Sequence, residues 1–305
     1  MAEEVQQRYK LYSLEINDRS GAVWRCLDTW TGKIVSMRKI YVDGMNDIAA
    51  VMREATLLMD LKHPNTVRLL DVLIHSNRVE LVSEHLDCDL LKYLEKPERI
   101  TQSQIKELLR QILKGLASCH SKNLVHGNLT PKSLLIDCKS GTVKLSVFGL
   151  TSINNVVSHH SHHHHHHHQR LHPDPGGEYT TWEMNAAYMA PEVLLGREGC
   201  SFAADVWSVG CILALMLTRQ HLFAMKGNEL GVHIPSQLDH MFRIRGSPEL
   251  LLENASSNYQ PQDLAATLNF GDSAGLDLIK RMLCLDPAQR ITVSDALAHE
   301  YLTNA

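Results

Sequence analysis

The first part of the chain alternates between runs typical of strands and one helical run. Residues 32–40 and 78–82 carry alternating or β-branched apolar positions, which predicts strands between Tyr9 and about Glu84. Residues 48–61 instead show helical spacing and stop before a His-Pro-Asn breaker at 63–65. The apolar face predicted for this helix consists of Val51, Ala55, Leu58 and Met59.

The pattern becomes mainly helical after Leu86. Residues 102–120, 205–218 and 275–283 carry apolar side chains at helical spacing. The apolar face of the first of these helices consists of Ile105, Leu108, Leu109, Ile112, Leu113 and Leu116. A strand-rich lobe at 1–85 followed by a helical lobe at 86–305 predicts an α+β fold.

Composition excludes some classes of protein and some partners. The chain has 305 residues, 44% hydrophobic and 21% charged, and these values are ordinary for a soluble globular protein. A net charge of -4 gives no reason to expect nucleic acid or an anionic membrane as a partner. We find no signal peptide or membrane anchor. The seven cysteines lack C-x-x-C spacing, which favours reduced thiols in the cytoplasm or nucleus.

Four motifs occur in a fixed order. They are LVHGNLTPKSLL at 124–135, KLSVFG at 144–149, APE at 190–192 and DVWSVG at 205–210. In this order they resemble the catalytic loop and following landmarks of protein kinases. Residues 63–65, 69–71 and 237–248 are similar to the cyclin-dependent kinases. The resemblance implies a bilobal protein-kinase fold in which Arg290 pairs with Glu192.

The catalytic positions depart from the family pattern. The resemblance places Asn128 where kinases have the aspartate base, and Thr130 where they have a lysine that contacts phosphate. It places Ser133 and Val147 where an amide and a carboxylate hold magnesium. Valine cannot bind a cation, and a neutral amide cannot accept the substrate proton at physiological pH. We therefore expect little or no phosphotransfer.

The resemblance also assigns a nucleotide site. Its residues are Gly21, Val23, Arg38, Glu54, Ser83 (the gatekeeper), Glu84, Leu86, Asp89 and Leu135. Only Gly21 remains of three expected glycines, and Asp18 adds a negative charge, so we expect weak phosphate binding. Arg38 fills the position of the family's strand lysine, with Lys39 as the alternative after a slip of one residue. ATP or another adenine nucleotide could then bind without magnesium, in a pocket made more polar by Ser36.

The skeleton of the family is retained where the chemistry is lost. The residues that match the hydrophobic spine are Leu58, Leu69, His126 and Phe148, and Asp205 matches its anchor. This favours a pseudokinase that acts by binding protein partners, such as a cyclin or another kinase. The alternative is an active serine/threonine kinase in which Asp137 or Asp18 is recruited, although Asp137 is typical of a turn. Thr180 matches the phosphorylated threonine of the activation loop, but only Arg53 remains of the three arginines that read it.

A histidine-rich segment interrupts the activation loop. Nine histidines lie within residues 158–169, inside a predicted disordered insertion at about 156–177. Metal or pH sensing is one hypothesis, because imidazole binds zinc, copper and nickel and titrates near neutral pH. A solvated repeat in a loop is the preferred interpretation, because nothing fixes the ligand geometry of a defined metal site.

Overall fold

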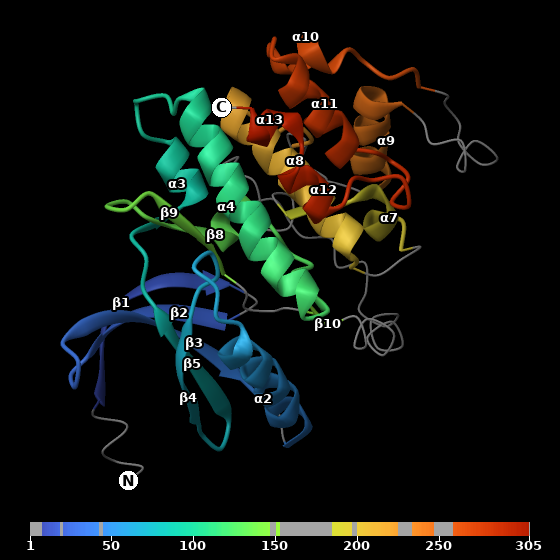
Figure 1. Cartoon of the computed structure of the whole chain (residues 1–305). Coiled ribbons are helices and arrows are strands. Elements are labelled where there is room, and N and C mark those ends of the chain that lie inside the picture. The colour runs from blue at the N-terminus through green and yellow to red at the C-terminus, as the bar shows by residue number, and fades with distance from the viewer. Residues whose placement is uncertain are drawn as a thin grey trace, which may run out of the picture.

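The computed structural model describes residues 8–18, 21–42, 45–146, 151–152, 185–196, 200–224, 234–246 and 259–304. Four features expected from the sequence lie outside these residues: Val147, Phe148, Thr180 and the histidine-rich segment. Figure 1 shows a smaller lobe built around a sheet and a larger lobe built mainly of helices. The predicted bilobal α+β fold is confirmed.

The smaller lobe is one antiparallel sheet in the order β1-β2-β3-β5-β4. Its strands are β1 (Tyr9–Asp18), β2 (Gly21–Asp28), β3 (Lys33–Tyr41), β4 (Leu69–Ile74) and β5 (Arg78–Glu84). Successive side chains of β3 alternate between the two faces of the sheet. Val35 and Met37 are buried with Tyr9 on one face, and Ile40 packs against the main core on the other.

One helix, α2 (Met45–Asp60), packs against β4 and β5 (Figure 1). Ala55 and Leu58 are buried as predicted, at 1% and 2% exposed. The prediction for Met59 is wrong, because its side chain is 44% exposed. Neighbouring residues of a helix point about 100° apart, so Leu58 and Met59 cannot both face the sheet directly.

The larger lobe contains two long helices and several short elements. The helices are α3 (Leu90–Leu94), α4 (Gln102–Ser121), α7 (Pro191–Leu194), α8 (Phe202–Thr218), α9 (Ile234–Arg245), α10 (Leu264–Leu268), α11 (Ser273–Met282), α12 (Val293–Leu297) and α13 (Glu300–Thr303). The strands are β6 (Cys88–Asp89), β7 (Leu124–Val125), β8 (Leu134–Asp137), β9 (Thr142–Leu145) and β10 (Thr151–Ser152), with a 3-10 turn η1 (Pro131–Ser133).

The core of this lobe forms around α4 and α8 (Figure 1). Thr101 caps α4 in a capping box with Gln104, and all six apolar positions predicted for its face are buried. α8 is buried along almost its whole length. Gly210 lets α8 approach α11 closely, because a Cβ there would lie 2.9 Å from Met282 and Leu283. No helix in the described ranges is long and apolar enough to cross a membrane.

Candidate catalytic and nucleotide site

The segment that matches the catalytic loop is anchored by one buried carboxylate. Asp205, on α8, is 1% exposed. It accepts hydrogen bonds from the backbone N–H of His126 at 2.9 Å and of Gly127 at 2.8 Å. His120 Nε2 lies 2.9 Å from the same carboxylate. These contacts fix the chain just before Asn128, as the family resemblance predicts for Asp205.

Three residues that match the hydrophobic spine are buried. Leu58, Leu69 and His126 are 2%, 7% and 3% exposed. His126 Nε2 lies 3.1 Å from the carbonyl oxygen of Ser146, and burial lowers the pKa of its imidazole. His126 therefore stays neutral near pH 7, and the packing of these three residues is intact.

The predicted catalytic positions of this segment, Asn128, Thr130 and Ser133, carry neutral side chains. Asn128 is exposed, whereas Thr130 is 8% exposed. The Ser133 hydroxyl donates to the Thr130 carbonyl at 2.9 Å and accepts from the Thr130 N–H at 3.0 Å. The only proton of this hydroxyl is thus used within the turn, which leaves one oxygen lone pair for a cation. Among the residues that the structure describes, no three His, Cys, Asp or Glu side chains gather as a metal site would require.

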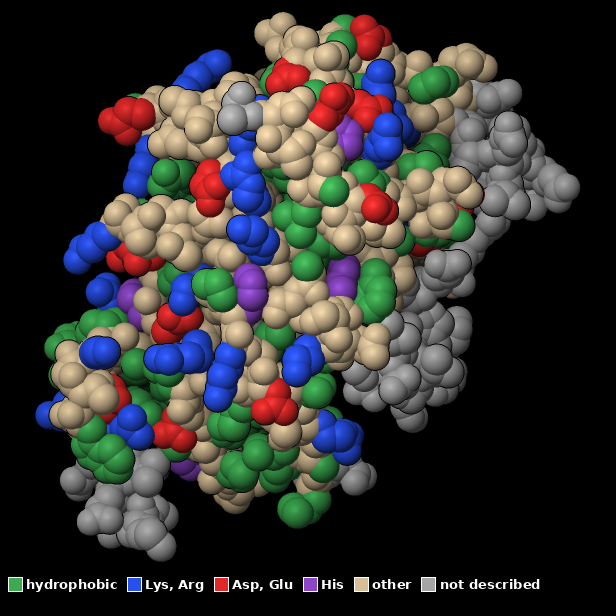
Figure 2. Space-filling model, viewed as in Figure 1, with side chains coloured by type: hydrophobic (Ala, Val, Ile, Leu, Met, Phe, Trp, Pro, Cys, Tyr) green, Lys and Arg blue, Asp and Glu red, His purple; other side chains and the backbone are tan. Residues whose placement is uncertain are grey.

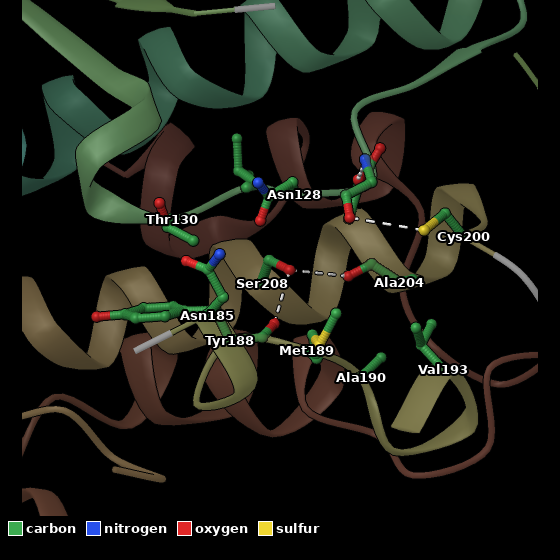
Figure 3. A pocket seen from close by; sticks show the side chains of 13 residues that line it. Asn128, Thr130, Asn185, Tyr188, Met189, Ala190, Val193, Cys200, Ala204 and Ser208 are labelled. Atoms are coloured by element: carbon green, nitrogen blue, oxygen red, sulfur yellow. Dashed lines mark hydrogen bonds between the residues drawn. The ribbon is translucent and has the colours of Figure 1, made fainter. Parts of the chain in front are cut away.

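A small hollow that opens to solvent lies beside this loop (Figure 3). Asn128 and Thr130 line one side, and Asn185, Tyr188 and Met189 line the other. The wall between them includes Cys200, Ala204 and Ser208. The Ser208 hydroxyl lies 2.8 Å from the Tyr188 carbonyl and ties this segment to α8. The hollow brings the predicted base position together with the segment that precedes the APE motif.

The register of β3 bears on whether Arg38 or Lys39 faces the space between the lobes. Arg38 lies opposite Val23 on β2 and Leu81 on β5. Lys39 Nζ lies 3.7 Å from Glu80 Oε1 and 5.4 Å from the centre of the Trp24 ring. Since Trp24 belongs to the cluster on the outer face, Lys39 points away from α2 and Arg38 occupies the strand face that α2 covers. Glu54 lies on α2, as the resemblance implies.

The segment that joins the lobes contains several predicted nucleotide-site residues. Ser83 is 2% exposed at the end of β5, and Leu86 is 9% exposed. The Glu84 carboxylate accepts two hydrogen bonds from Lys144 Nζ, at 2.8 and 2.7 Å, and one from the Arg68 N–H. This ion pair is one contact that the sequence did not reveal, because its partners lie 60 residues apart.

Three other predicted nucleotide-site positions lie on strands of both lobes. Asp89 caps α3 by accepting from the Lys92 N–H at 2.8 Å, so its carboxylate already has a structural role. Leu135 lies on β8 opposite Asp89. Gly21 begins β2 opposite Asp18, and residues 19–20 lie outside the described ranges. The structure thus places Leu135 and Asp89 together in one small sheet.

His85 was missed by the sequence analysis. Its Nδ1 lies 3.0 Å from the Ser36 hydroxyl and 3.9 Å from Glu15 Oε1. Burial lowers the pKa of His85, so the ring is neutral near pH 7. Ser36 and Ser83 are paired across β3 and β5, and the Ser83 hydroxyl lies 3.4 Å from the Ser36 carbonyl. A polar group formed by His85, Ser36 and Ser83 therefore borders the predicted adenine position.

Two further sequence predictions are confirmed. Arg290 binds Glu192 through two hydrogen bonds, at 2.6 and 3.0 Å, and the Arg290 side chain is fully buried. Asp137 is a turn residue that accepts from the N–H groups of Lys139 and Ser140. These bonds lower the pKa of Asp137 and engage its Oδ1, one of the two oxygens that the active-kinase hypothesis would recruit.

Comparison with known proteins agrees with these landmarks. The family model described as protein kinase domain matches residues 18–302. A relative named cell division control protein 2 homolog 2, from Trypanosoma brucei brucei, is 35% identical over 295 residues, which cover 92% of this chain and 78% of the relative. The chain belongs to the protein kinase family, and within it the chain resembles the cyclin-dependent kinases.

Proposed function

We propose that this chain is a pseudokinase of the cyclin-dependent type, which acts as a scaffold or allosteric partner rather than as a phosphotransferase. One contrast supports the proposal. The Asp205 carboxylate anchors the catalytic loop through two backbone N–H groups, yet the loop carries the neutral Asn128 at the base position. Selection for binding alone would keep the contacts that hold this loop in place and would allow its catalytic side chains to be lost.

The size of the expected defect follows from the residues that differ. Loss of a general base costs about 10²- to 10⁴-fold in rate. Phosphoryl transfer depends further on magnesium held by a carboxylate and an amide, and this chain has Val147 and Ser133 there. The Ser133 hydroxyl is already bonded to Thr130 in both directions. The base and the metal ions contribute differently to the same phosphoryl transfer, so the combined defect is at least as large as the loss of the base alone.

A restored variant tests this proposal. We would combine Asn128→Asp, Ser133→Asn and Val147→Asp, and measure phosphate incorporation into the chain and into a generic basic protein with magnesium and ATP. We expect no incorporation by the wild type above that of heat-inactivated protein, and measurable incorporation by the variant. The matched control is Asn185→Asp, which adds a carboxylate to the same hollow away from the base position. Phosphotransfer by the wild type, above that of heat-inactivated protein and constant in specific activity through successive purification steps, would contradict the proposal.

The alternative is an active serine/threonine kinase with atypical residues. Membership of the family and the name of the trypanosomal relative favour it. Asp137 is a poor recruit, because its carboxylate already accepts from Lys139 and Ser140 at the β8–β9 turn. Asp137→Asn and Asp18→Asn test the two forms of this alternative. Under our proposal neither variant has an activity to lose, whereas an active kinase would lose its activity when the aspartate that it recruits is replaced.

The remaining assignments follow from the same proposal. The predicted adenine position beside Ser36, Ser83 and His85 would take ATP or another adenine nucleotide without magnesium. The partners would be proteins, a cyclin or another kinase, in the cytoplasm or nucleus. Basic and acidic side chains are interspersed on the face seen in Figure 2, and the net charge is -4. Nucleic acids and anionic membranes attract strongly basic surfaces, so neither is among the proposed partners.

A further inference from the structure

Two thiols from distant parts of the sequence meet beside the segment that joins the lobes. Cys88 lies in β6 and Cys138 follows β8, and their Sγ atoms are 3.4 Å apart. Neither thiol is in a disulfide. Both lie at the small sheet formed by β6, β8 and β9, next to α3 (Figure 1).

The pairing of β6 with β8 brings these thiols together. Cys88 lies opposite Ile136, and Cys138 is two residues farther along, so its side chain points to the same face of the sheet. Asp87 extends this pairing beyond the strand. Its N–H donates to the Ile136 carbonyl at 3.1 Å, and its carboxylate accepts from the Cys138 N–H at 2.8 Å. The pairing of β6 with β8 and the two hydrogen bonds of Asp87 therefore hold the two sulfur atoms close together.

The two cysteines differ in environment. Cys138 is exposed, and Lys96 Nζ lies 3.7 Å from its sulfur. Oxidants react with thiolates, and only a thiol that solvent reaches can meet a peroxide from solution. Cys88 is partly buried, and burial together with Cys138 raises its pKa to about 12. Cys138 is thus the thiol that meets an oxidant first, and Cys88 lies within reach behind it.

We propose that Cys88 and Cys138 form a redox modification site, which hydrogen peroxide or an organic hydroperoxide converts to a reversible disulfide. In the first step the Cys138 thiolate attacks the peroxide, the O–O bond breaks, and the products are a sulfenic acid and hydroxide (or alkoxide). In the second step the Cys88 sulfur attacks the sulfenic sulfur, the S–O bond breaks, and one water leaves. Overall two thiols and one peroxide give one disulfide and two waters, or one water and one alcohol from an organic hydroperoxide.

The geometry needs only a small movement. A disulfide bond is about 2.05 Å long, so the sulfur atoms must approach by about 1.4 Å. The bond would join β6, which leads into α3, to the end of β8, across 50 residues of sequence. Closing a loop of that size restricts the unfolded chain and raises the midpoint of thermal unfolding. Asp89, which caps α3, directly follows Cys88, so the disulfide would also rigidify the predicted front of the nucleotide site.

Peptide mapping of the oxidised full-length protein tests this inference. Reduced protein would be titrated with hydrogen peroxide, free thiols blocked with iodoacetamide, and the digest analysed by mass spectrometry. We expect a peptide pair linked through Cys88 and Cys138, lighter by two hydrogen atoms and released by dithiothreitol. We also expect the oxidised protein to melt about 3–6 °C higher, and the reductant to reverse this shift.

Two variants distinguish a specific disulfide between Cys88 and Cys138 from general oxidation of the exposed thiols. Cys284→Ser, which changes another partly exposed thiol, should leave the linked peptide and the thermal shift intact. Cys88→Ser should abolish both and leave Cys138 to accumulate sulfenic and then sulfinic acid. If Cys88 and Cys138 remain fully alkylated at peroxide doses that oxidise Cys284, the inference is wrong. Because the mapping uses the wild-type chain, this outcome is decisive even if a variant fails to fold.

Discussion

Replacement of Asp205 by alanine tests the claim that one buried carboxylate holds the catalytic loop. The carboxylate is 1% exposed and accepts from the N–H groups of His126 and Gly127, with His120 Nε2 at 2.9 Å. Asp205→Ala leaves these backbone donors without a partner inside the protein. Each unsatisfied donor costs about 1–3 kcal/mol, and bonds to a charged group lie toward the upper end. We expect a loss of about 3–5 kcal/mol in the free energy of unfolding.

The corresponding change in melting temperature follows from the size of the chain. With an unfolding entropy of about 2.1 cal/mol/K per residue, the 305 residues give about 0.64 kcal/mol/K. The expected loss therefore lowers the midpoint by about 5–8 °C. Urea denaturation followed by circular dichroism and differential scanning calorimetry measure the two quantities independently. Asp60→Ala, at the exposed end of α2, is the matched control and should change stability by less than about 0.5 kcal/mol. An Asp205→Ala protein as stable as this control would refute the assigned role of the carboxylate.

Three further predictions concern the buried groups of the two lobes. Arg290→Met leaves the Glu192 carboxylate buried without its two hydrogen bonds, so urea denaturation should show a loss of about 3–5 kcal/mol; a loss below 1 kcal/mol would contradict this role. Leu58→Ala should cost about 2–5 kcal/mol and Met59→Ala less than about 1 kcal/mol, because only Leu58 is buried; equal losses would contradict the packing of α2. Burial lowers the pKa of His126, so the unfolded state binds this proton more readily; stability is full above about pH 6.5 and falls as the pH drops below it. His126→Phe should reduce that fall, by up to about 1.4 kcal/mol per pH unit, in denaturation curves between pH 5 and 7, and an unchanged slope would exclude His126 as its source.

The elements of the fold could be predicted because their periodicity is local. The apolar spacing of α4 predicted six buried positions, and all six are buried. The alternation of β3 also explains how Arg38 and Lys39 come to lie on opposite faces, since a strand reverses side at every residue. The prediction that Met59 lies on the buried face is wrong because a helical pattern does not give the width of the buried stripe. That width depends on how α2 meets β4 and β5.

The contacts of the site could be predicted only where a motif carries them. The bond between Arg290 and Glu192 follows from the family resemblance, and so does the anchoring by Asp205. The contacts of His85 with Ser36 and of Glu84 with Lys144 join residues 49 and 60 positions apart without any motif. Cys88 and Cys138 are 50 positions apart and lack the spacing of a known thiol motif. Only the register of the strands brings such side chains together.

Magnesium dependence of nucleotide binding tests the central claim most directly, because it requires no knowledge of a substrate or partner. The purified chain would be titrated with ATP in the presence of magnesium or of a chelator, and the melting midpoint followed, since a ligand that binds the native state raises it. The variant Ser133→Asn with Val147→Asp is the matched control that restores the two metal positions. We predict that any shift in the wild type is the same with and without magnesium, and that only the variant gains a magnesium-dependent shift. A wild-type shift that requires magnesium would contradict the account and favour an active kinase.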